Sequence, residues 1–103
     1  MSDLADLRPH VDAWCRLWGV EALAEEARVE LSSRMTHSLG RAYCDRNLVR
    51  LAARLEQGPR EFLEEVLCHE LAHLAAARRS GRRVKPHGAE WKALMRAAGY
   101  PPA

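Results

Sequence analysis

Two histidines and a glutamate stand together in the sequence HELAH, as His69, Glu70 and His73. Residues four apart in an α-helix project from the same face, so the two imidazoles can reach one metal ion. Zinc accepts neutral imidazole nitrogen, and the neighbouring carboxylate can take a proton from metal-activated water. The motif therefore predicts two zinc ligands and a general base, Glu70.

A catalytic zinc ion needs a third protein ligand and keeps one position open for water. Four residues elsewhere in the chain are candidates: His87, Glu90, His37 and Cys44. We choose His87, which lies 14 residues beyond His73, after a stretch long enough to turn the chain back. Glu90 is the alternative, either as a ligand itself or as a carboxylate that orients a ligating histidine.

The motif lies within the strongest predicted helix, which covers residues 60–79 and keeps its apolar residues at helical spacing. An amphipathic helix is predicted for residues 3–18, with Pro9 separating its first turn or two from the rest. A third helix is predicted for residues 88–98, with Trp91 turned toward the core. These helices must position the three histidines.

Three short strands are predicted between the first and second helices, at residues 29–35, 39–44 and 48–51. The last of them could instead begin a helix through residues 52–55. We expect the strands to form a small antiparallel sheet. The predicted fold class is α+β, with residues 1–103 forming a single domain.

Composition and cysteine usage narrow the class of protein. Hydrophobic residues make up 48% of the chain and charged residues 29%, which is typical of a globular domain. No apolar stretch approaches the roughly 20 residues that span a bilayer, and the N-terminus does not resemble a signal peptide. The 3 cysteines are widely and irregularly spaced. We therefore expect a cytoplasmic protein without a membrane partner.

Charge is unevenly distributed along the chain. The formal net charge is +2, but residues 78–96 carry a net charge of +6 and the remainder carries −4. A basic segment on a nearly neutral body can attract a polyanion or an acidic peptide. The alternative interpretation is that this segment is a solvent-exposed helix end and loop, whose arginines provide solubility and bind no partner.

Several segments, taken in order, resemble the SprT-like (Spartan-type) zinc metallopeptidase domain over residues 10–100. They are a strand, SLGRAY, LVRL, VLCHELAHLAA and PHGAEWKALM. HELAH is common to many zincins, whereas HELAH followed by H-G-x-x-W-K is more particular to this family. The resemblance implies a minimal zincin-like fold, zinc bound by His69, His73 and His87, and Glu70 as the catalytic base. It also implies proteolysis, in Spartan-type members of proteins crosslinked to DNA.

Many SprT-like proteins carry a cysteine-rich zinc ribbon after this domain, and we expect none within these residues, which contain no CxxC pair. Any contact with DNA is then expected through a run of basic residues: Arg78, Arg79, Arg82, Arg83 and Lys85.

We therefore predict a zinc metalloendopeptidase that cleaves a protein or peptide substrate. Residues 38–43 are the candidate edge strand for holding that substrate. Tyr43 and Tyr100 could donate a hydrogen bond to the tetrahedral oxyanion, although packed side chains are the plainer interpretation of both. The alternative function is a small nucleic-acid-binding or regulatory module whose zinc is structural and closed by a fourth ligand, such as Cys44 or Glu90.

Overall fold

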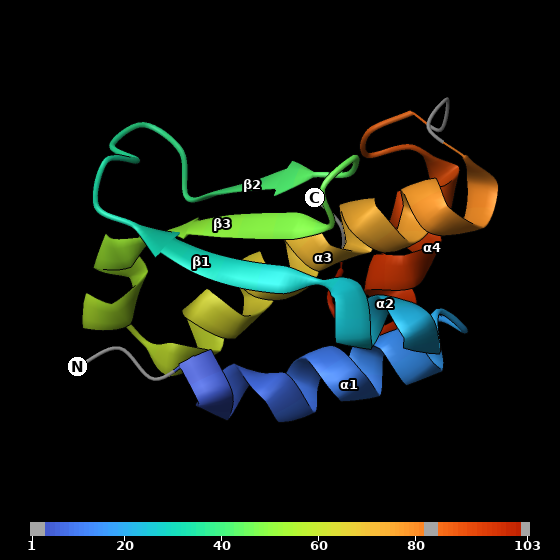
Figure 1. Cartoon of the computed structure of the whole chain (residues 1–103), viewed down its shortest axis with the longest axis horizontal. Coiled ribbons are helices and arrows are strands. Elements are labelled where there is room, and N and C mark those ends of the chain that lie inside the picture. The colour runs from blue at the N-terminus through green and yellow to red at the C-terminus, as the bar shows by residue number, and fades with distance from the viewer. Residues whose placement is uncertain (1–3, 82–84, 102–103) are drawn as a thin grey trace.

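The computed structural model of this protein describes residues 4–81 and 85–101. Its helices and strands, in chain order, are the 3₁₀-helix η1 (Leu4–Leu7), α1 (Arg8–Leu17), α2 (Glu21–Glu26), β1 (Arg28–Ser32), β2 (Gly40–Tyr43), β3 (Leu48–Ala52), the 3₁₀-helix η2 (Ala53–Gln57), α3 (Arg60–Ser80) and α4 (Ala89–Ala97). The helices lie on one side of a three-stranded sheet, and α3 runs between the sheet and α1 (Figure 1). The predicted α+β class is confirmed.

Helix α3 is the element around which the others pack. Its 21 residues span about 30 Å at the usual rise per residue, most of the 35 Å length of the molecule. The extended backbone of Pro59 precedes it, and Gly81 ends it with a φ of 87°, a left-handed conformation that favours glycine. Leucines 63, 67, 71 and 74 form a buried stripe along its length. The predicted helix at residues 60–79 is confirmed.

The sheet has the order β1-β3-β2, so β3 is the central strand. Strand β2 pairs antiparallel with β3, from Gly40 opposite Leu51 to Tyr43 opposite Leu48. Strand β1 pairs parallel with β3, however, with Val29 opposite Val49. The prediction of a wholly antiparallel sheet is therefore wrong for β1. Residues 33–39 reverse the chain between β1 and β2, but the two strands are not neighbours in the sheet. Strand β3 lies between them.

Two short helices differ from the sequence prediction. Helix α2 has only six residues, too few for a periodic pattern to identify, and it was not predicted. The alternative of a helix in place of the third strand is not adopted, because residues 48–52 form β3 and a 3₁₀-helix begins only at Ala53. Pro9 is the second residue of α1, where its missing N–H removes no helical hydrogen bond, and η1 precedes it as a separate turn.

The core lies between the sheet and the helices and joins α1, α3 and α4. Trp18 is buried, and its indole Nε1 donates a hydrogen bond to the carbonyl oxygen of Leu94 at 2.9 Å, which ties α1 to α4. Burial raises the pKa of the Cys15 and Cys68 thiols to about 11 and about 12, so both act as small apolar side chains. Within the described residues, no helix is long and apolar enough to cross a membrane.

Candidate metal centre

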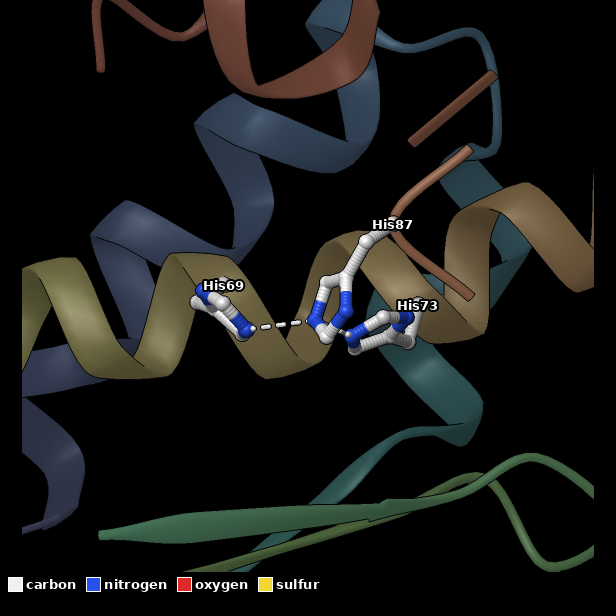
Figure 2. Close-up of side chains that lie close together, drawn as sticks. All are labelled: His69, His73 and His87. Carbon is white, nitrogen blue, oxygen red and sulfur yellow. Dashed lines mark hydrogen bonds between the residues drawn. The ribbon is translucent and has the colours of Figure 1, made fainter. Parts of the chain in front are cut away.

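Three imidazoles face one another above α3. His69 and His73 project from successive turns of α3, and His87 reaches them from the segment that leads into α4 (Figure 2). The Nε2 atom of His87 lies 3.2 Å from Nε2 of His69 and 3.2 Å from Nε2 of His73. The structure thus brings together the three histidines that the sequence predicted as ligands.

The backbone at His87 turns the ring toward α3. His87 has a φ of 58°, a left-handed conformation that is uncommon outside glycine. The amide of Gly88 donates to the carbonyl oxygen of Lys85 at 3.0 Å and closes a tight turn around it. A Cβ atom at residue 88 would itself lie 3.0 Å from that oxygen, so the turn favours glycine there. Unusual backbone conformations of this kind concentrate at functional sites.

This donor set fits a zinc ion. Three ligands in a tetrahedron at the usual Zn–N distance lie about 3.3 Å apart, close to the 3.2 Å that separates Nε2 of His87 from Nε2 of each of the other two histidines. Hydrogen bonding alone does not account for the cluster, because one ring nitrogen is either a donor or an acceptor and makes one strong in-plane bond. Three nitrogens converging on one point are instead the arrangement that a cation satisfies.

Burial favours the neutral form of the two imidazoles on α3, which is the form that binds metal. Desolvation lowers the pKa of His69, and the nearby His87 lowers it further. The same two causes, in the same order, together with His69, lower the pKa of His73 to about 4. Both rings on α3 are therefore neutral at physiological pH.

Trp91 of α4 supports the cluster from the core side. Its ring centroid lies 4.7 Å from that of His69, 5.4 Å from that of His73 and 4.6 Å from that of His87. Its Nε1 atom donates a hydrogen bond to the carbonyl oxygen of His69 at 3.1 Å. The predicted core position of Trp91 is confirmed, and the side chain also holds α4 against the motif.

Glu70 lies beside the histidines and against β2. Desolvation raises the pKa of its carboxyl group to about 7, and Arg41 partly opposes this shift. A Cβ atom at Gly40 would lie 2.9 Å from Cγ of Glu70 and 3.2 Å from Cγ1 of Val66. Strand β2 can approach Glu70 this closely because residue 40 has no side chain.

A cleft of about 370 Å³ opens beside these groups. It is lined by all three histidines and Glu70, and by residues of β2 and the loops: Gly40, Arg41, Ala42, Cys44 and Pro86. The candidate base and the candidate ligands thus share one solvent-open space with the edge strand that was predicted from residues 38–43.

The other candidate ligands do not join the histidine triad. Glu90 accepts a hydrogen bond from Oγ of Ser80 at 2.9 Å and pairs with Nε of Arg79 at 3.3 Å. His37 lines a neighbouring hollow. Cys44 lies at the rim of the cleft, with its Sγ atom 3.7 Å from the carbonyl oxygen of His73. Among the described residues, the histidine triad is the only group close enough to hold a metal ion.

Neither tyrosine lines the cleft. The ring of Tyr43 packs beneath the guanidinium groups of Arg46 and Arg50, each 5.2 Å from its centroid. The ring of Tyr100 packs edge-on against Trp14, with centroids 6.4 Å apart. Both tyrosines are therefore packed side chains, the plainer of the two interpretations of the sequence.

Two members of the basic run are engaged within the protein. Arg78 pairs with Glu26, and Arg79 donates to the carbonyl oxygen of Trp18 at 3.0 Å as well as pairing with Glu90. Lys85 is exposed. Arg82 and Arg83 lie outside the described residues.

Sequence reasoning missed the roles of Gly40 and Arg41 beside Glu70. A glycine inside a predicted strand was the one available signal, because such a glycine often marks the close approach of another group.

Comparison with known proteins gives a consistent result. A family model described as SprT-like family matches residues 11–102. Protein SprT of Pseudomonas paraeruginosa (strain DSM 24068 / PA7) is 46% identical over 65 residues, which cover 61% of this chain and 39% of that protein. Protein SprT of Klebsiella pneumoniae subsp. pneumoniae is 48% identical over 59 residues, covering 56% of this chain and 35% of that protein.

Protein SprT of Vibrio parahaemolyticus is 47% identical over 57 residues, which cover 54% of this chain and 34% of that protein. The matched segments therefore span little more than a third of these relatives. No solved structure matches this chain.

Proposed function

This chain belongs to the SprT-like family, and from that premise we propose that it is a zinc-dependent metalloendopeptidase. In this proposal His69, His73 and His87 hold the zinc ion, and Glu70 is the general base. The observation that carries it is the meeting of three imidazoles beside a carboxylate at an open cleft, with Nε2 of His87 3.2 Å from Nε2 of His69 and of His73 and all three ligand atoms within 4.8 Å of one another. A catalytic zinc site has this composition of three protein ligands and room for water.

In the proposed hydrolysis the three histidines hold the metal ion and Glu70 transfers the proton. When bound, zinc supplies Lewis acidity, which polarises a carbonyl and makes water more acidic. Glu70 accepts a proton from the attacking water on a carboxylate oxygen and returns it to the nitrogen of the leaving amine. Burial raises the pKa of this carboxyl group to about 7 in the metal-free protein, so its carboxylate is a stronger base than an exposed one.

Strand β2 provides the surface that orients a peptide. It is one of the two end strands of the sheet within the described residues, and the one that lines the cleft. The amide of Ala52 donates to the carbonyl oxygen of Leu39, and hydrogen-bonded and non-hydrogen-bonded pairs alternate along an antiparallel ladder. The backbone groups of Gly40 and Ala42 therefore point to the open edge, where an extended substrate can add as a strand.

The test is cleavage of casein by the purified protein, followed by gel electrophoresis and mass spectrometry. We expect zinc-dependent cleavage that a chelator stops and added zinc restores. Glu70→Gln should reduce cleavage by about 10²–10⁴-fold, the usual contribution of a general base, while the zinc content remains one per chain. If Glu70→Gln cleaves as fast as the wild type, or if zinc is bound without any cleavage, the metal is structural and the proposal fails.

A second part of the proposal concerns substrates on DNA. The basic run at residues 78–85 would contact phosphates, with salt-sensitive and sequence-independent affinity. Lys85 is exposed, and Lys85→Gln is the variant of choice because its side chain forms no ion pair among the described residues. We expect single-stranded DNA to stimulate histone cleavage at low salt and this stimulation to fall in Lys85→Gln. Cleavage that is indifferent to DNA would refute this part and leave the peptidase proposal standing.

A further inference from the structure

Large apolar side chains are exposed at few places on this molecule. Among the described residues they are Leu17, Leu39 and Phe62, with exposed fractions of 54%, 39% and 43%. Leu17 is on α1, whereas Leu39 and Phe62 both line one hollow next to the metal centre. An exposed apolar side chain is common on its own, but two that line the same hollow indicate a binding surface.

This hollow, which we call the Phe62 pocket, has a volume of about 500 Å³. One wall is formed by residues 37–40, which lead into β2, and the other by one face of the first turns of α3. Phe62, Val66 and His69 follow each other at helical spacing along that face. The pocket is therefore built from the edge strand and the motif helix, the two elements that the proposed peptidase uses.

The Phe62 pocket is next to the cleft that the three histidines line. Gly40, His69 and Glu70 line both. A peptide that adds to β2 with its scissile carbonyl at the histidines must place a neighbouring side chain in this direction, because successive side chains of a strand leave it on alternate faces. The pocket thus adjoins the space where the scissile bond would lie.

We propose that the Phe62 pocket binds a large apolar side chain of the substrate next to the scissile bond, and that Phe62 and Leu39 determine this preference. The inference rests on the proposed peptidase function and adds its substrate class. An apolar side chain such as that of leucine, methionine or phenylalanine fits a wall of this composition and removes the exposed faces of Phe62 and Leu39 from water.

A negatively charged residue of the Phe62 pocket, Glu65, suggests a second substrate class, a basic side chain. Glu65 also lines the pocket and is exposed, so its carboxylate stays in water when the apolar wall is covered. A pocket selected for lysine or arginine would instead depend on this carboxylate. Glu65→Gln removes the charge and Phe62→Ala removes part of the apolar wall. Comparing the two variants therefore distinguishes a preference for basic side chains from a preference for apolar ones.

The experiment uses the zinc-loaded protein and a mixture of peptides in which one residue varies among Ala, Leu, Phe, Lys and Glu. Cleavage sites are mapped by mass spectrometry, and kcat/KM is measured for the best peptide and for its alanine counterpart. Phe62→Ala is compared with Leu17→Ala, the matched loss of an exposed apolar side chain on α1, and with Glu65→Gln. Zinc content and the melting temperature are recorded for each variant.

We expect the wild type to prefer Leu or Phe over Ala next to the scissile bond by about tenfold or more, the usual range for apolar pockets. Phe62→Ala should reduce this ratio severalfold with unchanged zinc content, while Leu17→Ala and Glu65→Gln keep it. Because the ratio compares two substrates of one variant, a general loss of folded enzyme cancels.

Three results would overturn the inference while leaving the peptidase intact. They are cleavage without side-chain preference, a preference that Phe62→Ala does not change, and a preference for Lys or Arg that Glu65→Gln removes. If the wild type cleaves no peptide and no protein under these conditions, the proposed function itself fails, and that outcome is distinct from the other three.

Discussion

At the scale of single residues, Glu70 is held where its own ionisation is unfavourable. Its pKa is about 7 in the folded protein, against an ordinary value of 4.5, because the carboxyl group is desolvated. The folded state therefore binds the proton more tightly than the unfolded chain. The resulting stabilisation is fully present below pH 4.5 and is lost as the pH rises through 7.

This pH dependence of stability leads to a prediction for the zinc-free protein. Glu70→Gln cannot ionise, so it escapes the loss of stability that the wild type undergoes between pH 4.5 and 7. We expect the variant to melt at a higher temperature than the wild type at pH 8, and the difference to shrink toward zero near pH 4.5. Thermal unfolding in the presence of a chelator across this pH range provides the measurement. A melting difference that does not depend on pH would contradict the assignment of a raised pKa.

Gly40 provides a second prediction at this scale. A methyl group at residue 40 would meet Cγ of Glu70 at 2.9 Å, so the carboxylate must move. We expect Gly40→Ala to lower kcat about tenfold to a hundredfold, the sensitivity of catalysis to displacements of this kind, with zinc content unchanged. Steady-state kinetics and metal analysis provide the measurement.

The matched control is Gly58→Ala, where the added methyl group approaches only the carbonyl oxygen of Leu55, at 3.9 Å. Gly58 has a φ of −104°, which alanine adopts freely. This variant should keep the kcat of the wild type. Equal losses in both variants would mean that the effect is a general loss of folded protein and not a displacement of Glu70.

At the scale of elements, the metal centre depends on the contact between α3 and α4. Trp91 is 2% exposed, packs against all three imidazole rings and bonds to the backbone of α3. Trp91→Phe keeps an aromatic ring and removes the N–H donor. Trp91→Ala removes the ring and leaves a cavity.

We expect Trp91→Phe to destabilise the protein by about 1 kcal/mol, the net value of one hydrogen bond, with a small change in zinc affinity. Trp91→Ala should lose about 3–5 kcal/mol and bind zinc more weakly, because nothing then holds α4 against the motif helix. Denaturant unfolding and zinc competition with a chromogenic chelator provide the measurements. Unchanged zinc affinity in Trp91→Ala would show that Trp91 does not hold the three ligands in place.

At the scale of the whole molecule, a bound zinc ion would join two segments that are separate in the sequence. His69 and His73 belong to α3, and His87 belongs to the segment entering α4. A ligand that binds only the folded state stabilises it by about 2.7 kcal/mol at a free concentration of 100 times its Kd.

We therefore expect a chelator to lower the melting temperature of the wild type by several degrees and added zinc to restore it. In His87→Ala this response should be greatly reduced, whereas His37→Ala should respond like the wild type because His37 lies outside the triad. Differential scanning calorimetry at several zinc concentrations provides the measurement. A full response in His87→Ala would remove that residue from the ligand set.

The sequence determined those features that depend on local spacing. The period of its apolar residues predicted α3 to within one residue of its observed end at Ser80. The spacing of HELAH placed His69 and His73 on one helix face, and the 14 positions from His73 to His87 allowed His87 to return to them. Each of these is settled within a few turns of chain, where helical geometry leaves little freedom.

Only the tertiary structure decided the parallel pairing of β1 with β3, the approach of Gly40 to Glu70 and the Phe62 pocket. Each joins segments whose relation depends on the order of strands in the sheet. That order follows from which apolar faces the sheet can bury against α3, a cooperative result of packing the whole chain. Turn residues and strand periodicity reveal where a strand lies along the sequence but carry no information on which neighbour it will pair with.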